Sequence, residues 1–344
     1  MSATLGYDLM KWLTESVEDI LHRLIAPILL CKSRAPSLRQ EVTLSTSTLT
    51  DEEIRELYSS SPKVDEGSFY IPECRSTNLG HVAKIASDAV VKRSLTTGNY
   101  ERLSAELVRR YTSVPVPMHE RVFRYRHEVY VVQQYIPGHV LLDVWTQLSW
   151  WMRLRVLVTL RFYIRELRSI SSRAGPPPFP GPPSDDCTPQ KCTGRLFTED
   201  GRSGPFHSYQ EMTKWYQKQL LFMQRRWKEG LDSAPFDDNS PLVFTHMDLH
   251  PRNIILSDDG QLWIVDWTDA GWYPSWFEAA SMILFTDHRR DIPSSWTSCI
   301  PFISGCCDRP GQLPFMNSIS YTLVVLGADS INLVRVIILS LAAY

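Results

Sequence analysis

The sequence has no marked excess of charge of either sign. Its 344 residues include 36 Lys and Arg against 38 Asp and Glu, which gives a formal net charge of −2. A nucleic-acid or anionic-membrane partner usually requires a strongly basic surface, so we expect neither partner here. With 43% hydrophobic and 22% charged residues, the composition is that of a folded globular protein and excludes a chain that is disordered throughout.

Cysteines with the spacing of a structural zinc site are also missing. The seven cysteines are an odd number without a repeated C-x-x-C, which argues against a disulfide framework and against structural zinc. They are Cys31, Cys74, Cys187, Cys192, Cys299, Cys306 and Cys307. Unpaired cysteines are typical of a reducing compartment, and we expect a cytoplasmic protein.

Long uninterrupted apolar runs are absent as well. The run Leu24–Cys31 is short and contains Pro27, and Asp329 interrupts the apolar stretch Ile319–Tyr344. A membrane-spanning helix needs about 20 predominantly apolar residues. Acidic and basic residues between Asp8 and Asp19 interrupt any signal-peptide core. The sequence therefore predicts a soluble chain with no membrane segment.

The order of the predicted elements divides the chain into four parts. Residues 1–67 form an N-terminal helical extension, 68–134 a small β-rich lobe, 135–303 a larger and mostly helical lobe, and 304–344 a divergent tail. A linker at Gln134–Gly138 joins the two lobes. Six prolines within residues 175–184 predict a loop-like insertion in the larger lobe. The expected fold class is therefore α+β with two lobes.

Hydrophobic periodicity predicts the individual elements. We expect helices at Tyr7–Leu30, Asn99–Tyr111, Arg153–Ser169 and Ser208–Trp227, and a short helix capped by Thr50 or Asp51. Strands are predicted at Phe69–Ile71, Val82–Ile85, Ala89–Lys92, Val122–Tyr125, Glu128–Gln134, Val243–Thr245, Ile254–Leu256 and Leu262–Val265.

The segment H-M-D-L-H-P-R-N at 246–253, followed by V-D-W at 265–267, carries the strongest chemical signal. It fits the kinase catalytic-loop pattern H-x-D-L-x-x-x-N with a second Asp after a short hairpin. Phosphoryl transfer needs a carboxylate that orients or deprotonates the acceptor hydroxyl, and Asp248 is predicted for that role. Asn253 and Asp266 supply hard oxygen donors for Mg²⁺ if the hairpin Ile254–Val265 folds the second Asp back over the loop. An ordinary polar loop would match these four positions by chance about once in a thousand such chains.

These residues resemble the aminoglycoside phosphotransferase/choline kinase branch of the protein-kinase-like fold, most closely its fungal phosphotransferase members. The matching positions are His246, Asp248, Leu249, Pro251, Asn253, Asp266, Trp267, the A-G-W-Y-P block at 270–274, and Glu278. The blocks at 90–92, 112–117 and 130–138 are also similar, so the resemblance covers about residues 68–300. It implies a two-lobed kinase fold, ATP with Mg²⁺ as cofactors, and phosphorylation of a hydroxyl on a small molecule.

The same resemblance implies a nucleotide site. Lys92 would pair the ATP phosphates with a helix Glu; Glu101 matches the family's position better than the alternative, Glu106. Backbone groups of Gln134 and Ile136 at the hinge would hydrogen-bond the adenine. The loop that covers the phosphates would lie near Cys74–Gly80, although its single glycine does not make a G-x-G-x-x-G.

Other residues near the motif have more than one interpretation. His246 is expected to brace the catalytic loop, and Met247 stands where the family often has Gly. His250 is either part of the site or a surface histidine. The tryptophans near the second Asp are more often core packing than a ligand wall; they are Trp263, Trp267, Trp272 and Trp276.

The sequence also bears on the substrate. Only twelve positions separate Asp266 from Glu278, too few for the activation loop of a protein kinase, and D-F-G and A-P-E motifs are absent. After Glu278, four Asp are balanced by four Arg, so the acidic basin that a polycationic aminoglycoside requires is not predicted. We expect a neutral or mixed hydroxylated metabolite. A catalytically degenerate binding protein, and in last place an atypical protein kinase, are the alternatives.

Overall fold

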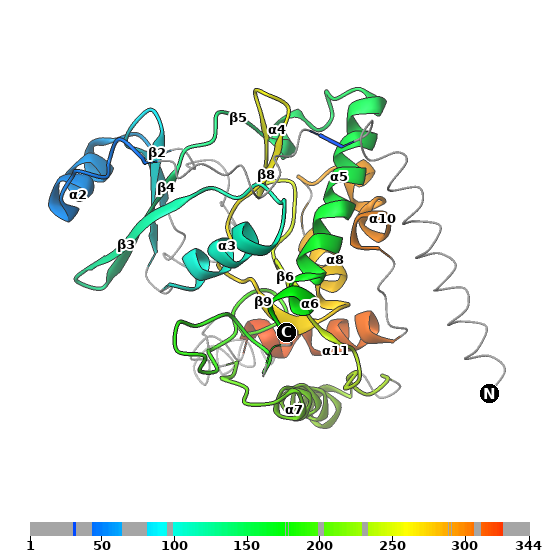
Figure 1. Cartoon of the computed structure of the whole chain (residues 1–344). Coiled ribbons are helices and arrows are strands. Elements are labelled where there is room, and N and C mark those ends of the chain that lie inside the picture. Colours follow the sequence, from blue (N-terminus) through cyan, green and yellow to red (C-terminus); the bar gives the residue numbers. More distant parts are fainter. Residues whose placement is uncertain are drawn as a thin grey trace, which may run out of the picture.

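The computed structural model describes residues 30–31, 43–63, 81–94, 99–175, 177, 179–198, 203–228, 233–287, 289, 291–305 and 311–325. The predicted helix Tyr7–Leu30, apart from its last residue, the strand Phe69–Ile71 and the loop Cys74–Gly80 lie outside these ranges. The described part has a small lobe built on one sheet and a larger lobe built mainly of helices (Figure 1). The α+β, two-lobed fold predicted from the sequence is confirmed.

The small lobe is an antiparallel sheet flanked by two helices. Its strands are β1 (His81–Lys84), β2 (Ala89–Ser94), β3 (His119–Tyr125) and β4 (Glu128–Gln134), in the order β1-β2-β4-β3. The helices are α2 (Asp51–Ser60) and α3 (Tyr100–Tyr111). Thr50 caps α2 through a capping box with Glu53, as one of the two predicted caps. Strand β4 has the bounds that the sequence predicted.

The larger lobe begins at the linker and contains two long helices, several short helices and two small sheets. In chain order they are β5 (Gly138–Val140), α4 (Leu141–Val144), α5 (Trp150–Arg168), α6 (Ile170–Ala174), α7 (Tyr209–Trp227), β6 (Leu242–Thr245), β7 (Ile254–Ser257), β8 (Leu262–Ile264), β9 (Gly271–Pro274), α8 (Phe277–Asp287), α9 (Ser294–Thr297), α10 (Ile300–Ser304) and α11 (Gln312–Val325). The described residues of the predicted loop 175–184 contain no helix, as the prolines require.

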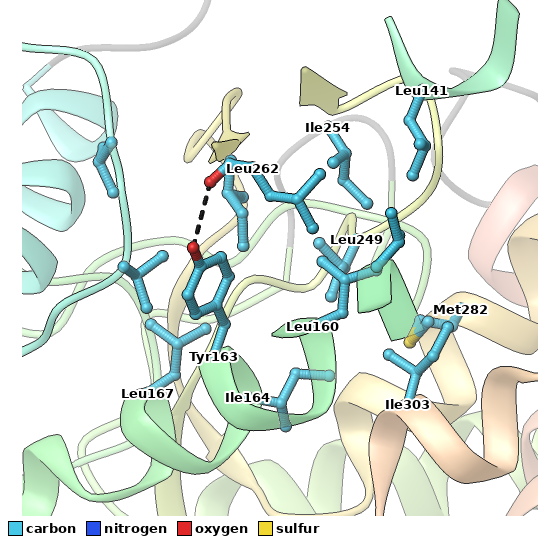
Figure 2. Close-up of a cluster of buried hydrophobic side chains, with 14 of the residues drawn as sticks. Leu141, Leu160, Tyr163, Ile164, Leu167, Leu249, Ile254, Leu262, Met282 and Ile303 are labelled. Carbon is cyan, nitrogen blue, oxygen red and sulfur yellow. Dashed lines mark hydrogen bonds between the residues drawn. The ribbon is translucent and has the colours of Figure 1, made fainter. Parts of the chain in front are cut away.

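Helix α5 supports the segment that carries the predicted catalytic residues. Its apolar face buries Leu160, Tyr163 and Ile164 against Leu249 of the catalytic loop and Leu262 of β8 (Figure 2). The Tyr163 hydroxyl also donates to the Leu262 carbonyl oxygen at 3.4 Å. Burying side chains of this size stabilises the fold by about 1.5–3 kcal/mol each, so the loop rests on a rigid base.

A second core extends the larger lobe past its predicted end. Phe315 and Ile319 of α11 are buried against Tyr216 and Leu220 of α7, and α7 and α11 lie next to each other in Figure 1. The family resemblance did not extend to this region, and no helix was predicted at 312–325. The described part of the tail nevertheless belongs to the same hydrophobic core.

Two sequence expectations concern the described chain as a whole. Across the ranges given above, no helix is both long and apolar enough to cross a membrane. Four of the seven cysteines lie in these ranges, and each is a free thiol: Cys31, Cys187, Cys192 and Cys299.

Candidate active site

A lysine from the small lobe meets two carboxylates at the junction of the lobes. Lys92 lies on β2, and its Nζ is 3.2 Å from Glu101 Oε2 on α3 and 2.6 Å from Asp266 Oδ1 after β8. The Lys92 side chain is 13% exposed and that of Glu101 1% exposed. The structure thus brings together three predicted site residues from β2, α3 and the segment after β8, the last of them 174 positions from Lys92.

The structure distinguishes between the two candidate glutamates. Glu101 contacts Lys92, whereas Glu106 pairs with Arg102, one turn away on α3, at 2.6 Å. The Glu106 side chain lies on the outer side of α3 and is half exposed. Burial alone would raise the pKa of Glu101, but the Lys92 ammonium and the neighbouring His119 together hold that pKa below its usual value. Burial likewise opposes charge on Lys92, yet Asp266 and Glu101 keep its pKa raised. All three groups are therefore ionised at neutral pH.

Asp248 is held by two neighbours from its own loop. Asn253 Nδ2 donates to Asp248 Oδ2 at 2.8 Å and to the Asp248 carbonyl oxygen at 2.9 Å. His250 Nε2 lies 3.3 Å from Asp248 Oδ1, and His250 Nδ1 accepts from the Arg252 N–H. This second bond places the imidazole proton on Nε2, so a neutral His250 donates to Asp248. At 1% exposure, His250 is not a surface histidine, which was one of its two interpretations.

His246 braces the loop from inside the lobe. Its N–H donates to Glu278 Oε2 at 2.6 Å, its Nδ1 accepts from the Asp248 N–H, and its Nε2 lies 3.1 Å from the Val265 carbonyl oxygen. Complete burial lowers the pKa of His246 to about 4, so the ring is neutral. These contacts match the structural role expected from the sequence.

Met247 has a backbone conformation that favours glycine. Its φ is +69°, in the left-handed region, and its side chain is fully buried. Left-handed backbone costs an L-residue about 1–2 kcal/mol. The family's frequent Gly at this position thus has a steric reason, and this chain compensates by packing the Met side chain into the core of the larger lobe.

The hairpin β7–β8 returns Asp266 to the catalytic loop, as predicted. Ile254 pairs with Ile264, and the Val265 N–H donates to the Asn253 carbonyl oxygen at 3.0 Å. Asp266 then takes a left-handed φ of +62°, and Lys92, ahead of Thr268, lowers its pKa despite burial. Asp266 is 28% exposed on its side chain.

The oxygen atoms of Asp266 and Asn253 suit Mg²⁺ both in their chemistry and in their number. Within the described ranges, no group of three or more His, Cys, Asp and Glu side chains could hold a metal. Mg²⁺ uses one or two protein oxygen ligands together with substrate phosphates. The Asp266 carboxylate and the Asn253 amide oxygen, whose Nδ2 is already bound to Asp248, fit that mode of binding.

Two acidic residues of the site, Glu278 and Asp269, have raised pKa values that the sequence did not predict. Glu278 is buried beneath the catalytic loop, and burial raises its pKa to about 7. Asp269 was not singled out; burial and then the charge of Asp248 raise its pKa to about 7. Its position three residues after Asp266 was the only available signal.

The hinge residues lie where strand β4 leaves the sheet. The N–H of Gln134 donates to Met118 and that of Tyr135 to Asp88, both at 2.8 Å. The Ile136 N–H has no hydrogen-bond partner among the described residues. The Gln134 N–H is thus used within the protein, while the Ile136 N–H is available to an adenine edge.

The tryptophans pack as core around the loop rather than line a ligand site. Trp267 and Trp276 are buried, and Trp267 contacts the His246 ring at a centroid distance of 4.6 Å. Trp272 lies on β9, where it stacks edge-on against Phe244. The preferred interpretation from the sequence agrees with this packing.

Comparison with known proteins places the chain in a family. The profile of the phosphotransferase enzyme family matches residues 82–296, more than half of the chain. No curated protein matches the sequence significantly.

Several solved structures are similar in fold. A thermostable mutant of aminoglycoside phosphotransferase APH(4)-Ia is 16% identical with a TM-score of 0.48, covering 80% of this chain and 92% of the other. The gentamicin complex of APH(2")-IIa is 12% identical with a TM-score of 0.46, covering 80% and 86%. Spectinomycin phosphotransferase APH(9)-Ia with ADP and spectinomycin is 12% identical with a TM-score of 0.40, covering 72% and 78%.

Proposed function

The chain belongs to the phosphotransferase enzyme family, and on that premise we propose that it transfers the γ-phosphate of ATP to a hydroxyl of a small molecule. The observation that carries the proposal is the meeting of Lys92 with Glu101 and Asp266, beside an Asp248 that Asn253 and His250 hold in place. A nucleotide-binding lysine, a metal-binding pair and an acceptor-orienting carboxylate are the parts that phosphoryl transfer requires.

Asp248 is suited to orient the acceptor. Burial would raise its pKa, but His250 and other neighbours hold it below its usual value, so it is ionised and accepts a hydrogen bond from the acceptor hydroxyl. The hydroxyl oxygen forms a bond to the γ-phosphorus while the bond from that phosphorus to the β,γ-bridging oxygen breaks, and ADP leaves with that electron pair. The hydroxyl proton passes to Asp248 or to water.

The nucleotide would lie between the lobes. The Lys92 ammonium contributes positive charge to the phosphates, and the Ile136 N–H is a donor for adenine. Asn253 and Asp266 would hold Mg²⁺, which supplies further neutralisation of phosphate charge when bound.

A small acceptor fits this chain better than a protein substrate. The short segment after Asp266 is folded back into the lobe, because β9 pairs with β6 from Leu242↔Pro274 to Thr245↔Gly271. A protein kinase uses the equivalent segment as an activation loop and substrate platform. The A-G-W-Y-P block at 270–274, whose last four residues form β9, is among the motifs that support our proposal that the chain is most similar to the family's fungal members.

The test has two stages that separate binding from turnover. Mg-ATP at millimolar concentration is expected to raise the thermal midpoint of the protein in a concentration-dependent way. A panel of hydroxylated metabolites is then screened for acceptance of the labelled γ-phosphate. Binding without transfer to any acceptor would favour a degenerate binding protein, and no shift with Mg-ATP would overturn the proposal.

A further inference from the structure

A cluster of three arginines, Arg195, Arg252 and Arg289, lies close to Asp248. Phe285 of α8 stacks on His250 at a centroid distance of 3.7 Å, and His250 in turn contacts Asp248. The guanidinium carbons of Arg195 and Arg289 lie 4.4 and 4.7 Å from the centre of the same Phe285 ring. One aromatic ring thus connects two cations with the carboxylate that orients the acceptor.

The segment that carries Arg195 is fixed against the site. Thr193 Oγ1 donates to Asp269 Oδ1 at 2.6 Å. Gly194 has a φ of +99°, and a Cβ added to it would lie 2.9 Å from Asp269 Oδ2. A side chain would be strained there, so the turn lies close to Asp269, and the next residue, the exposed Arg195, places its guanidinium over Phe285.

The three arginines of the cluster outnumber the two carboxylates, Asp248 and Asp291, whose charges act on them. Arg252 hydrogen-bonds Asp291, and Arg289 lies 3.9 Å from the same carboxylate, so two guanidinium groups share one acid that is 43% exposed. Arg195 has no ion-pair partner in the described part of the chain, and Arg252 Nε is buried without a hydrogen bond there. Buried cations of like sign destabilise one another unless an anion joins them.

The pKa shifts of Arg289 and Asp248 agree with the close spacing of these charges. Burial and then the charge of Arg252 lower the pKa of Arg289, and Arg195 adds to this effect. Arg195 also contributes to the lowered pKa of Asp248. The arginines therefore lie close enough to act on the acceptor-orienting carboxylate.

The position of the cluster points to the acceptor rather than to the nucleotide. Arg195 follows the proline-rich insertion, Arg252 belongs to the catalytic loop, and Arg289 follows α8, so all three come from the larger lobe. Lys92, which is expected to bind the ATP phosphates, comes from the small lobe instead, and Ile136, expected to bind adenine, from the linker; only the proposed metal ligands Asn253 and Asp266 share the larger lobe with the arginines.

We propose that the acceptor carries an anionic group, a carboxylate or a phosphate, which Arg195 and Arg289 bind while Asp248 orients the hydroxyl. Planar guanidinium groups bind both anions through paired hydrogen bonds. This inference rests on the proposed function and names its substrate class. It also excludes the polycationic acceptors of the antibiotic-modifying relatives.

The test compares four six-carbon polyols that differ mainly in charge: sorbitol, gluconate, sorbitol 6-phosphate and glucamine. Their affinities are measured by calorimetry with Mg²⁺ and a non-hydrolysable ATP analogue, and transfer is measured separately with ATP. We expect one anionic polyol to bind at least about tenfold more tightly than sorbitol and glucamine. Which anionic polyol is preferred distinguishes a carboxylate from a phosphate.

Arg195→Gln is the main variant, because Arg195 is exposed and its loss leaves the core intact. It is expected to remove most of the anion preference without changing affinity for the ATP analogue, and Arg195→Lys should retain part of it. Arg124→Gln, at an exposed arginine on β3, is the matched control and should leave the preference unchanged.

Three results would overturn the inference: equal or tighter binding of sorbitol or glucamine, an anion preference that survives in Arg195→Gln, or a loss of ATP-analogue affinity in that variant. Preferential anion binding without phosphate transfer would leave the inference standing and count against the proposed function. Preferred phosphorylation of sorbitol or glucamine would overturn the inference and support the proposed function.

Discussion

Lys92 Nζ lies 2.6 Å from Asp266 Oδ1, although 174 positions separate the two residues in the sequence. This ion pair connects the sheet of the small lobe with the segment that follows the catalytic hairpin. It places the proposed nucleotide lysine and the proposed metal ligand within one hydrogen-bonded group that also includes Glu101 and Thr268.

The two glutamates of α3 give the first prediction. Glu101→Gln is expected to reduce Mg-ATP affinity about tenfold and to destabilise the fold by about 2 kcal/mol, because it removes a buried charge that faces Lys92. Glu106→Gln, the matched control on the outer side of the helix, should change stability by less than about 0.5 kcal/mol. Thermal unfolding with and without Mg-ATP measures both. Equal effects of the two substitutions would contradict the role of Glu101.

The second prediction concerns Asp266. Asparagine tolerates left-handed backbone, so Asp266→Asn should keep the φ of +62° and the fold while removing the carboxylate. The variant is expected to bind ATP with the same affinity in the presence and absence of Mg²⁺, whereas the wild type should bind more tightly with Mg²⁺. Calorimetric titration with and without the metal checks this. If the wild type bound ATP with the same affinity with and without Mg²⁺, the role given to Asp266 would be ruled out.

Asp248 gives the third prediction. Asp248→Asn should lower phosphate transfer by about 10²–10⁴-fold, because the amide cannot accept the hydroxyl proton. Mg-ATP affinity should change little, because Lys92 and Asp266 remain. The control is Asp258→Asn in the exposed hairpin turn, which should leave the transfer rate at the wild-type level. Transfer that persists in Asp248→Asn would assign the role to another group.

The backbone at Met247 gives the fourth prediction. Met247→Ala loses the buried side chain and keeps the left-handed strain, so it should destabilise the protein by about 2–5 kcal/mol. Met247→Gly loses the same side chain but relieves the strain, so it should be about 1 kcal/mol more stable than the Ala variant. Chemical denaturation of both variants gives this difference. The usual order, with Ala more stable than Gly, would show that the strain is absent.

Glu278 gives a prediction about pH. Its pKa is raised from 4.5 to about 7 in the folded protein, so the folded state binds this proton more tightly than the unfolded state. The stabilisation is complete below pH 4.5 and is lost as the pH rises through 7. Relative to Glu278→Gln, the free energy of unfolding of the wild type should therefore fall by about 3 kcal/mol over that window.

The comparison with Glu278→Gln isolates this group from His246. The pKa of His246 is lowered to about 4, so its contribution is present above its unfolded value and is lost as the pH falls through about 4, in the opposite direction. Both proteins contain His246, and its contribution cancels in the difference. A difference that is constant from pH 4.5 to pH 7 would show that Glu278 is ionised throughout.

The catalytic loop was predictable because its parts are close in sequence. The offsets among His246, Asp248 and Asn253 and the turn of the hairpin set their local geometry, and β7–β8 needs only short-range pairing to return Asp266. The hydrophobic alternation that predicted β4 and the spacing that predicted α3 are local signals of the same kind. The choice of Glu101 over Glu106 was less certain, because it depends on which face of α3 meets Lys92.

By itself, the sequence determined the two-lobed α+β fold and the residues of the catalytic loop, because fixed spacing and periodicity are local properties of the chain. Only the tertiary structure decided the rest. Arg195 and Arg289 meet at Phe285, and Arg252 and Arg289 share Asp291, because long-range packing brings the segment after the insertion and the segment after α8 onto one loop. The balance of charge after Glu278 includes only Arg289 of these three arginines, whereas folding brings Arg195 and Arg252 from earlier segments to join it near Asp248.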